Sequence, residues 1–233
     1  MTVRIDKPVQ GGTVKAVASK SEAHRLLICA ALSAQLPANT ASANGETFIA
    51  CPERSEDIDA TARCLEALGA ALRYERDGFF VKPIPTPHSL FPPALLNLDC
   101  GESGSTLRFL LPVCGTLGLS ASFTMSGRLS ERPLSVLCET MASHGCTLSE
   151  PGNSPLTCKG KLNSGAYTLP GNVSSQFTSG LLFALPLLDG ESIIRVTGVL
   201  ESRPYVDMTL DALRLFGITV IEETAHVFRI PGR

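Results

Sequence analysis

The sequence of 233 residues contains no tryptophan, and only 18% of its residues are charged. The formal net charge of −2 gives no basic excess, which argues against nucleic-acid binding, because such binding needs a clearly basic surface. No apolar run reaches the length that spans a bilayer, since charges, glycine or proline interrupt each one. With 44% hydrophobic residues, the chain is predicted to be a well-buried globular protein without a membrane segment.

The sequence also lacks any pair of cysteines with the C-x-x-C spacing of a zinc site. Its eight cysteines are scattered, and several lie within apolar stretches, where cysteine behaves as a small hydrophobic residue. The first residues have no signal or transit character. We therefore expect reduced structural thiols, no metal site and a cytoplasmic location.

Three short stretches rich in serine and glycine run directly into apolar helices, at residues 19–21, 101–105 and 173–176. The amino end of a helix has unpaired N–H groups and partial positive charge, so it binds anions. Two of these helices carry an arginine near their start, Arg25 and Arg108. Three such ends meeting at one place would form a site for a ligand rich in phosphate and carboxylate.

The chain repeats itself at intervals of 76 and 72 residues, measured between the glycines Gly69, Gly145 and Gly217. Each glycine suits a left-handed helix cap and is followed by a hairpin pattern. The predicted unit is βαβαββ, repeated over about 16–83, 95–160 and 165–231. This pattern indicates an α/β fold.

The two helices of each unit differ in character. The first is apolar nearly all round and is expected at the centre, whereas the second is apolar on one side, as Ile58, Ala62 and Leu65 indicate. We expect the second helices outside, with the sheets between them and the centre. Glu56 and Asp57 are interpreted as the cap of one such helix.

Five stretches, taken in order along the chain, resemble the enolpyruvyl transferases. They are residues 19–25, 101–108, 130–133, 173–177 and 202–205. The resemblance implies one domain of an inverse α/β barrel, with central buried helices and outer sheets. Family chains are about twice as long and have two domains, so this chain looks like the N-terminal half. Residues 1–15 would then be a strand segment partly belonging to the missing C-terminal domain, and 16–233 a substrate-binding domain.

Among these enzymes, the chain is most similar to those of the shikimate pathway of aromatic amino acid biosynthesis. The resemblance implies transfer of the enolpyruvyl group from phosphoenolpyruvate to the 5-hydroxyl of shikimate 3-phosphate, with release of phosphate. It also implies a monomer that needs no metal or organic cofactor and is the target of glyphosate. The aspartate and lysine for proton transfer would lie in the missing half, so no catalytic residue is assigned here and this chain alone is expected to be inactive.

The resemblance assigns binding residues position by position. Those for shikimate 3-phosphate are Lys20, Ser21, Arg25, Ser174, Ser175, Gln176, Ser202 and Tyr205. Those for phosphoenolpyruvate are Lys20, Gly104, Arg132 and Gln176. Lys20 would contact both substrates, Gly104 would bring backbone close to phosphoenolpyruvate, and the planar fork of Arg132 would clamp it.

Two further residues of these stretches, Arg108 and His24, have other interpretations, and Arg25 has an alternative one. Arg108 is expected in a buried structural ion pair, and a surface ion pair with Glu22 is the alternative for Arg25. His24 stands where related sequences usually have asparagine, and it could orient Arg25.

Other functions remain open. The related UDP-N-acetylglucosamine enolpyruvyl transferase typically has Lys-Asn at the first helix and a reactive cysteine or aspartate in a mobile loop. Here Lys20 is followed by Ser21, and the corresponding loop, residues 126–133, has no cysteine. A non-catalytic anion-binding module is a second alternative. Cyclisation of RNA phosphate ends on a similar fold has no support from the net charge.

Overall fold

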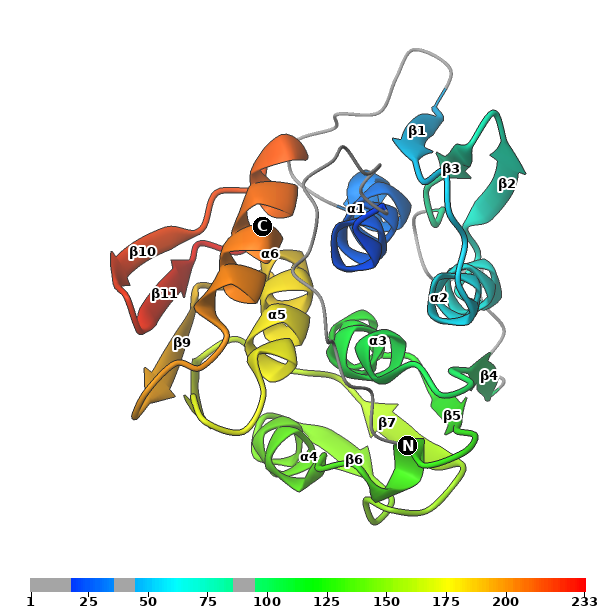
Figure 1. The fold of residues 1–233 in the computed structure, drawn as a ribbon. Coiled ribbons are helices and arrows are strands. Elements are labelled where there is room, and N and C mark those ends of the chain that lie inside the picture. Colours follow the sequence, from blue (N-terminus) through cyan, green and yellow to red (C-terminus); the bar gives the residue numbers. More distant parts are fainter. Residues whose placement is uncertain (1–17, 36–44, 86–94) are drawn as a thin grey trace, which may run out of the picture.

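The computed structural model describes residues 18–35, 45–85 and 95–233 (Figure 1). The helices are α1 (Lys20–Leu32), α2 (Glu56–Ala67), α3 (Gly104–Leu117), α4 (Ser135–Ala142), α5 (Ser175–Ala184) and α6 (Arg203–Leu215). The strands are β1 (Thr47–Ala50), β2 (Ala71–Glu75), β3 (Gly78–Lys82), β4 (Leu96–Asp99), β5 (Ala121–Thr124), β6 (Cys146–Leu148), β7 (Leu156–Gly160), β8 (Ala166–Pro170), β9 (Ser192–Thr197), β10 (Ile221–Thr224) and β11 (Val227–Ile230).

Two of the three sheets have the same topology. Their strand orders are β4-β5-β7-β6 and β8-β9-β11-β10. In each, the first two strands run parallel and the others are antiparallel. In the described residues the third sheet has three strands, in the order β1-β3-β2. This order matches the last three strands of each of the other two sheets. The predicted βαβαββ order is therefore confirmed for the second and third units. The segment 1–15, predicted as a strand, lies outside the described residues.

A left-handed glycine follows the second helix of every unit, as the repeat predicts. The φ angles of Gly69, Gly145 and Gly217 are 98°, 105° and 73°. Only glycine adopts such angles without steric cost, and each of these turns the chain from a helix into a hairpin. The hairpins β2–β3, β6–β7 and β10–β11 follow in turn.

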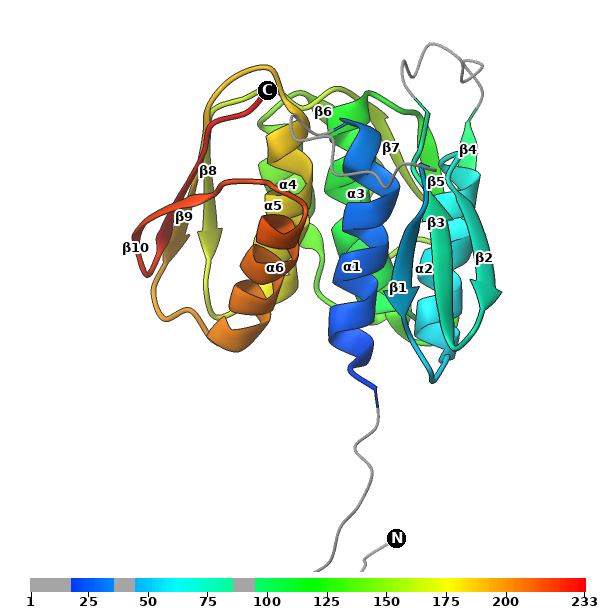
Figure 2. The ribbon, with the colours of Figure 1, turned by 90° about the horizontal axis from the view of Figure 1, so that it is seen from above.

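The first helices of the units are central and the sheets are outside (Figures 1 and 2). Helices α1, α3 and α5 are buried over most of their surface, as their apolar sequences predict. The expected position of the second helices is wrong for α2 and α6, because no sheet separates these two from the central helices. Helix α2 packs directly on α1, α3 and β4, and α6 packs on α1 and α5. These helices fill gaps between sheets because their single apolar face fits against the central helices.

The closest packing of two central helices occurs where α5 crosses α3 at Gly180. A methyl group on Gly180 would lie 2.2 Å from the carbonyl oxygen of Arg108. Pro112, four residues after Arg108 in α3, has no N–H to donate to that carbonyl. Glycine in α5 and proline in α3 together allow the backbones to approach.

All eight cysteines are buried and free, as predicted. Burial raises the pKa of the Cys29 and Cys114 thiols, so these side chains are neutral packing groups. No helix in the described ranges is long and apolar enough to cross a membrane.

The helix crossing yields a stability prediction. Gly180→Ala should lower the free energy of unfolding by about 2 kcal/mol or more, because the new methyl group meets fixed backbone. Gly115→Ala, within α3, is the matched control, since the atoms nearest to its new methyl would be side-chain atoms of Cys146, Leu162 and Met141, at 2.9, 3.1 and 3.1 Å. We expect it to lower stability less than Gly180→Ala does, because side chains can shift where backbone cannot and alanine favours a helix more than glycine. Urea unfolding of both variants tests this, and equal stability of the two would contradict it.

Candidate functional site

A pocket of about 360 Å³ lies where four helices begin. It is lined by Ser21, Arg25, Ser105, Phe109, Gly171, Val173, Ser174, Ser175, Gln176, Glu201, Ser202 and Tyr205. These residues come from the first two turns of α1 and α3, from the first turns of α5 and α6, and from the segments that precede α5 and α6. The three serine-rich helix starts that the sequence singles out therefore contribute to one pocket.

Seven of the eight residues predicted to bind shikimate 3-phosphate line this pocket, the exception being Lys20. The Lys20 ammonium group instead lies 2.5 Å from the Asp57 carboxylate, and both side chains are partly exposed. Gly104 and Arg132 also lie outside the lining residues, next to the Ser105 side of the pocket.

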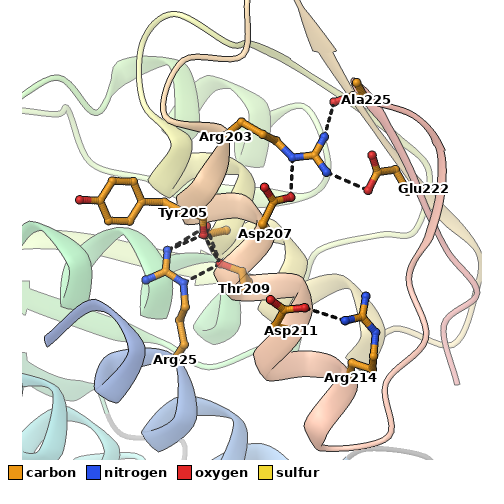
Figure 3. Close-up of polar contacts among 10 residues, drawn as sticks. Arg25, Arg203, Tyr205, Asp207, Thr209, Asp211, Arg214, Glu222 and Ala225 are labelled. Carbon is orange, nitrogen blue, oxygen red and sulfur yellow. Dashed lines mark hydrogen bonds and ion pairs between the residues drawn. The ribbon is translucent and has the colours of Figure 1, made fainter. Parts of the chain in front are cut away.

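Arg25 is the most deeply buried charged side chain of the pocket, with 2% of its surface exposed. Its guanidinium group donates to the Tyr205 carbonyl oxygen and to the Thr209 hydroxyl, both at 2.8 Å (Figure 3). It also donates to the Ser21 carbonyl oxygen at 2.7 Å and to the Ser179 hydroxyl at 3.5 Å. Every one of these acceptors is neutral.

The alternative ion pair between Arg25 and Glu22 is absent from the described ion pairs, so that interpretation is wrong. Burial lowers the pKa of Arg25 to about 10, which leaves the group charged at neutral pH. A buried cation with only neutral partners has an unmet preference for an anion.

The serines at the helix starts differ in whether their side-chain hydroxyl caps the helix. The Ser174 hydroxyl accepts from the Gln176 N–H and caps α5. Ser202, at the start of α6, has a left-handed backbone conformation with φ 57° and ψ 36°. Its side chain makes no hydrogen bond that caps the helix. The Ser202 hydroxyl is therefore available to a ligand in the pocket.

Arg108 departs from its predicted role, because it has no carboxylate partner among the described residues. It donates to the Gln176 side-chain oxygen and to the Pro133 carbonyl, both at 3.0 Å. Its Nε has no hydrogen-bond partner within the described ranges. Burial and the nearby charge of Arg132 lower the pKa of Arg108. The expected ion pair is wrong, and the group is a second buried cation without an acid.

Gly104 lies against these two guanidinium groups. A methyl group on it would be 2.5 Å from Nη1 of Arg108 and 3.3 Å from Nη1 of Arg132. Gln176 connects this cluster to the pocket, since it accepts from Arg108 and donates to the Ser105 hydroxyl at 2.9 Å. One amide side chain therefore lines the pocket and also hydrogen bonds to an arginine of this cluster.

His24 does not hydrogen bond to Arg25, so its suggested role is wrong. Its Nδ1 lies 2.7 Å from the Thr61 hydroxyl, which lies 2.7 Å from that of Thr106. This buried chain of polar groups joins α1, α2 and α3. Burial, outweighing the opposing effect of Asp57, lowers the pKa of His24 from its usual 6.5 to about 4.

The interpretation of Glu56 and Asp57 as a helix cap also needs correction. Ser55 is the cap of α2, and it accepts from the Ile58 N–H. Glu56 and Asp57 lie in the first turn, where a negative charge interacts favourably with the helix dipole.

Several pocket residues were not predicted from the sequence. They are Ser105, Phe109, Gly171, Val173 and Glu201. Ser105 and Val173 lie within the serine-rich stretches, which was a usable signal. Thr209, which holds Arg25, lies one helical turn after Tyr205, but nothing in the sequence connects it with α1. No three or more His, Cys, Asp or Glu side chains in the described ranges are grouped so as to hold a metal ion.

The fold and this pocket define an α/β protein of repeated βαβαββ units whose helix starts and buried arginines form an anion site. The family model that matches is EPSP synthase (3-phosphoshikimate 1-carboxyvinyltransferase), over residues 3–233. The chain belongs to the EPSP synthase family, a family of carboxyvinyltransferases.

Curated relatives agree with this family. The 3-phosphoshikimate 1-carboxyvinyltransferase of Clostridium kluyveri is 43% identical over 222 residues, which are 95% of this chain and 49% of that protein. The enzyme of the same name from Clostridium acetobutylicum is 39% identical over 233 residues, 99% of this chain and 52% of that protein. The chain spans about half the length of these relatives.

A solved structure supports the fold. EPSP synthase from Acinetobacter baumannii aligns with a TM-score of 0.75 and 24% identity, over 95% of this chain and 47% of that chain. This likeness confirms the expected fold, with the chain covering about half of the longer protein.

The buried imidazole of His24 yields a prediction about pH. Because its pKa is lower in the folded than in the unfolded chain, the unfolded chain binds the extra proton as the pH falls from 6.5 towards 4. Stability should fall over that interval by on the order of 3 kcal/mol from this group. His24→Asn removes the titration, so its unfolding free energy should depend less steeply on pH. Equal slopes for the two chains in urea unfolding between pH 4 and 7 would refute this.

Proposed function

We propose that this chain is the shikimate 3-phosphate-binding half of a 3-phosphoshikimate 1-carboxyvinyltransferase. The observation that carries the proposal is the pocket itself. It combines the buried guanidinium of Arg25, which has only neutral partners, with serines at the starts of four helices. A ligand with a phosphate ester and a carboxylate supplies the negative charge that these groups lack.

We assign the residues of the pocket to the parts of this ligand by chemistry. Arg25, with the hydroxyls of Ser21 and Ser202, would bind a charged end, because a guanidinium fork fits carboxylate and phosphate oxygens. Ser174 and Ser175 would donate to the phosphate ester from the start of α5, where the helix dipole favours negative charge. Phe109 and the ring of Tyr205 would bound the apolar face of the ligand's ring, since both line the pocket.

We place phosphoenolpyruvate beside this pocket, at Lys20, Gly104, Arg132 and Gln176. Gln176 lines the pocket and accepts from Arg108, so it lies between the two proposed binding sites. Arg108 and Arg132 have no described acidic partner and crowd the backbone of Gly104, which suits a small, doubly charged ligand. Lys20 would exchange its exposed Asp57 partner for substrate.

In the proposed reaction the methylene carbon of phosphoenolpyruvate takes up a proton. The 5-hydroxyl oxygen of shikimate 3-phosphate gives up its proton and attacks the adjacent carbon. Phosphate then leaves from the tetrahedral intermediate, while the methyl group gives back a proton to restore the double bond. The role of this chain is to hold two anions together and offset their repulsion. The titratable groups among the lining residues are Arg25, Glu201 and Tyr205. We assign the proton transfers to groups of a second domain.

We further propose that the enzyme works as a monomer in the cytoplasm. Eight free, buried thiols support a reducing location. Size-exclusion chromatography with light scattering tests the monomer, and a concentration-independent dimer would refute that part of the proposal.

Ligand binding tests the proposed function. Calorimetric titration of this chain with shikimate 3-phosphate should give one saturable site, and Arg25→Met should weaken it about a hundred-fold. Arg25→Lys should recover part of the affinity, because it keeps the charge but loses the planar fork. Arg63→Met is the control, since Arg63 pairs with Asp99 on the surface, away from the lining residues. Saturable binding of UDP-N-acetylglucosamine instead would favour the related transferase, and binding of neither ligand would overturn the proposal.

Turnover gives a separate expectation. This chain alone should release no phosphate from phosphoenolpyruvate and shikimate 3-phosphate, because groups for proton transfer must be within hydrogen-bond reach of the substrate. A steady-state phosphate-release assay at a micromolar concentration of the chain checks this. Sustained release that Arg25→Met abolishes would place the proton-transfer groups in this chain and refute the assignment to a second domain.

A further inference from the structure

Ser202 has a backbone conformation that its own residue type disfavours. Apart from the hairpin turn at Arg76 and Asp77, it is the one described non-glycine residue with a positive φ. A side chain in this left-handed region carries a steric cost, so surrounding contacts must hold it there. A serine at a helix start usually has an extended backbone and caps the helix with its hydroxyl. Ser202 does neither, and it lines the pocket.

Arg203, the next residue, makes contacts that fix this turn. Its guanidinium group donates to Asp207 at 2.6 Å within α6, to Glu222 at 2.8 Å on β10, and to the Ala225 carbonyl at 3.0 Å (Figure 3). It also lies over the Phe228 ring, 5.6 Å from its centre. One side chain therefore joins the first turn of α6 to the hairpin β10–β11.

The opposite side of the same turn is held by Arg25. Its Nη2 donates to the Tyr205 carbonyl at 2.8 Å, and the Thr209 hydroxyl donates to the same oxygen at 3.0 Å. The Tyr205 N–H in turn donates to the Ser202 carbonyl at 3.0 Å. The turn that begins at Ser202 is thus held by Arg25 of α1 on one side and, through Arg203, by the outer sheet on the other.

We propose that Arg203 is a positioning residue for the ligand pocket: its clamp on the β10–β11 hairpin keeps Ser202 left-handed, with the hydroxyl free for the phosphorylated ligand. Arg203 is not among the lining residues and acts through its neighbour. This inference rests on the proposed function for the identity of the ligand, but the conformational part does not depend on it.

Arg214 provides a matched control. It lies on the same helix and forms an ion pair with Asp211 at 2.6 Å, but this pair is exposed and stays within α6. Arg203→Met and Arg214→Met therefore remove the same charge from the same helix. Glu222→Gln is a milder variant that weakens the clamp from the hairpin side, distant in sequence from Ser202.

The first test needs no ligand. Backbone chemical shifts and the amide-to-Hα coupling of Ser202, measured by nuclear magnetic resonance on the free chain, report its φ angle. In the original chain and in Arg214→Met we expect the shifts and the coupling of Ser202 to have the values typical of a left-handed backbone. In Arg203→Met they should move towards an average that includes extended backbone. Unchanged left-handed values in Arg203→Met would overturn the inference, whatever the chain binds.

The second test uses titration with shikimate 3-phosphate. Arg203→Met should weaken binding about ten-fold and Glu222→Gln about three-fold. In both variants the Ser202 hydroxyl is no longer held in the position where it would contact the charged ligand. Arg214→Met should bind as the original chain does. In a Ser202→Ala background, Arg203→Met should weaken binding less than about two-fold, because the group it positions is gone.

A general loss of folding would give a different pattern. It would weaken binding equally with and without the Ser202 hydroxyl, and that result would overturn the inference. If the original chain binds shikimate 3-phosphate and Arg203→Met binds it equally well, the positioning role fails while the proposed function stands. If the original chain does not bind it, the proposed function fails. The amide-to-Hα coupling of Ser202 then still tests whether Arg203 holds Ser202 in its left-handed conformation.

Discussion

The close crossing of α3 and α5 is the constraint on which the rest of the structure depends. The absence of a side chain at Gly180 lets α5 lie against the Arg108 carbonyl, and the missing N–H of Pro112 leaves that carbonyl without its usual helical donor. Gln176, one turn before Gly180, is thereby brought to the Arg108 guanidinium. Because α6 packs on α5 and α1 packs on α6, the positions of all four helix starts at the pocket follow from this crossing.

Arginines in this protein fall into two electrostatic classes. Arg203 has two carboxylate partners, so its charge is compensated within the fold. Arg25 and Arg108 are buried beside neutral oxygens alone and keep an uncompensated charge. Removing a cation from water without an acid is costly, and a bound anion offsets that cost. This contrast distinguishes arginines that hold the fold together from those suited to a ligand.

Much of the fold could be predicted because its signals are local. The left-handed glycines, the hairpins and the all-round apolar helices are each encoded within about a dozen residues, and the repetition of the pattern identified the unit. The positions of α2 and α6 were predicted wrongly, because a single apolar face does not reveal whether a sheet or a helix covers it. Family resemblance, rather than any local pattern, suggested which of the serines and arginines share a pocket.

The sequence by itself determined the order of the elements, the places where helices end and the presence of three serine-rich helix starts, because these depend on backbone preferences of neighbouring residues. Only the tertiary structure decided the partners of the charged groups. Arg108 meets Gln176 across 68 residues and Arg25 meets Thr209 across 184. His24 likewise finds Thr61 rather than Arg25. Such contacts arise from how the repeats pack on one another, and the electrostatic energy of a buried group is set by those distant neighbours.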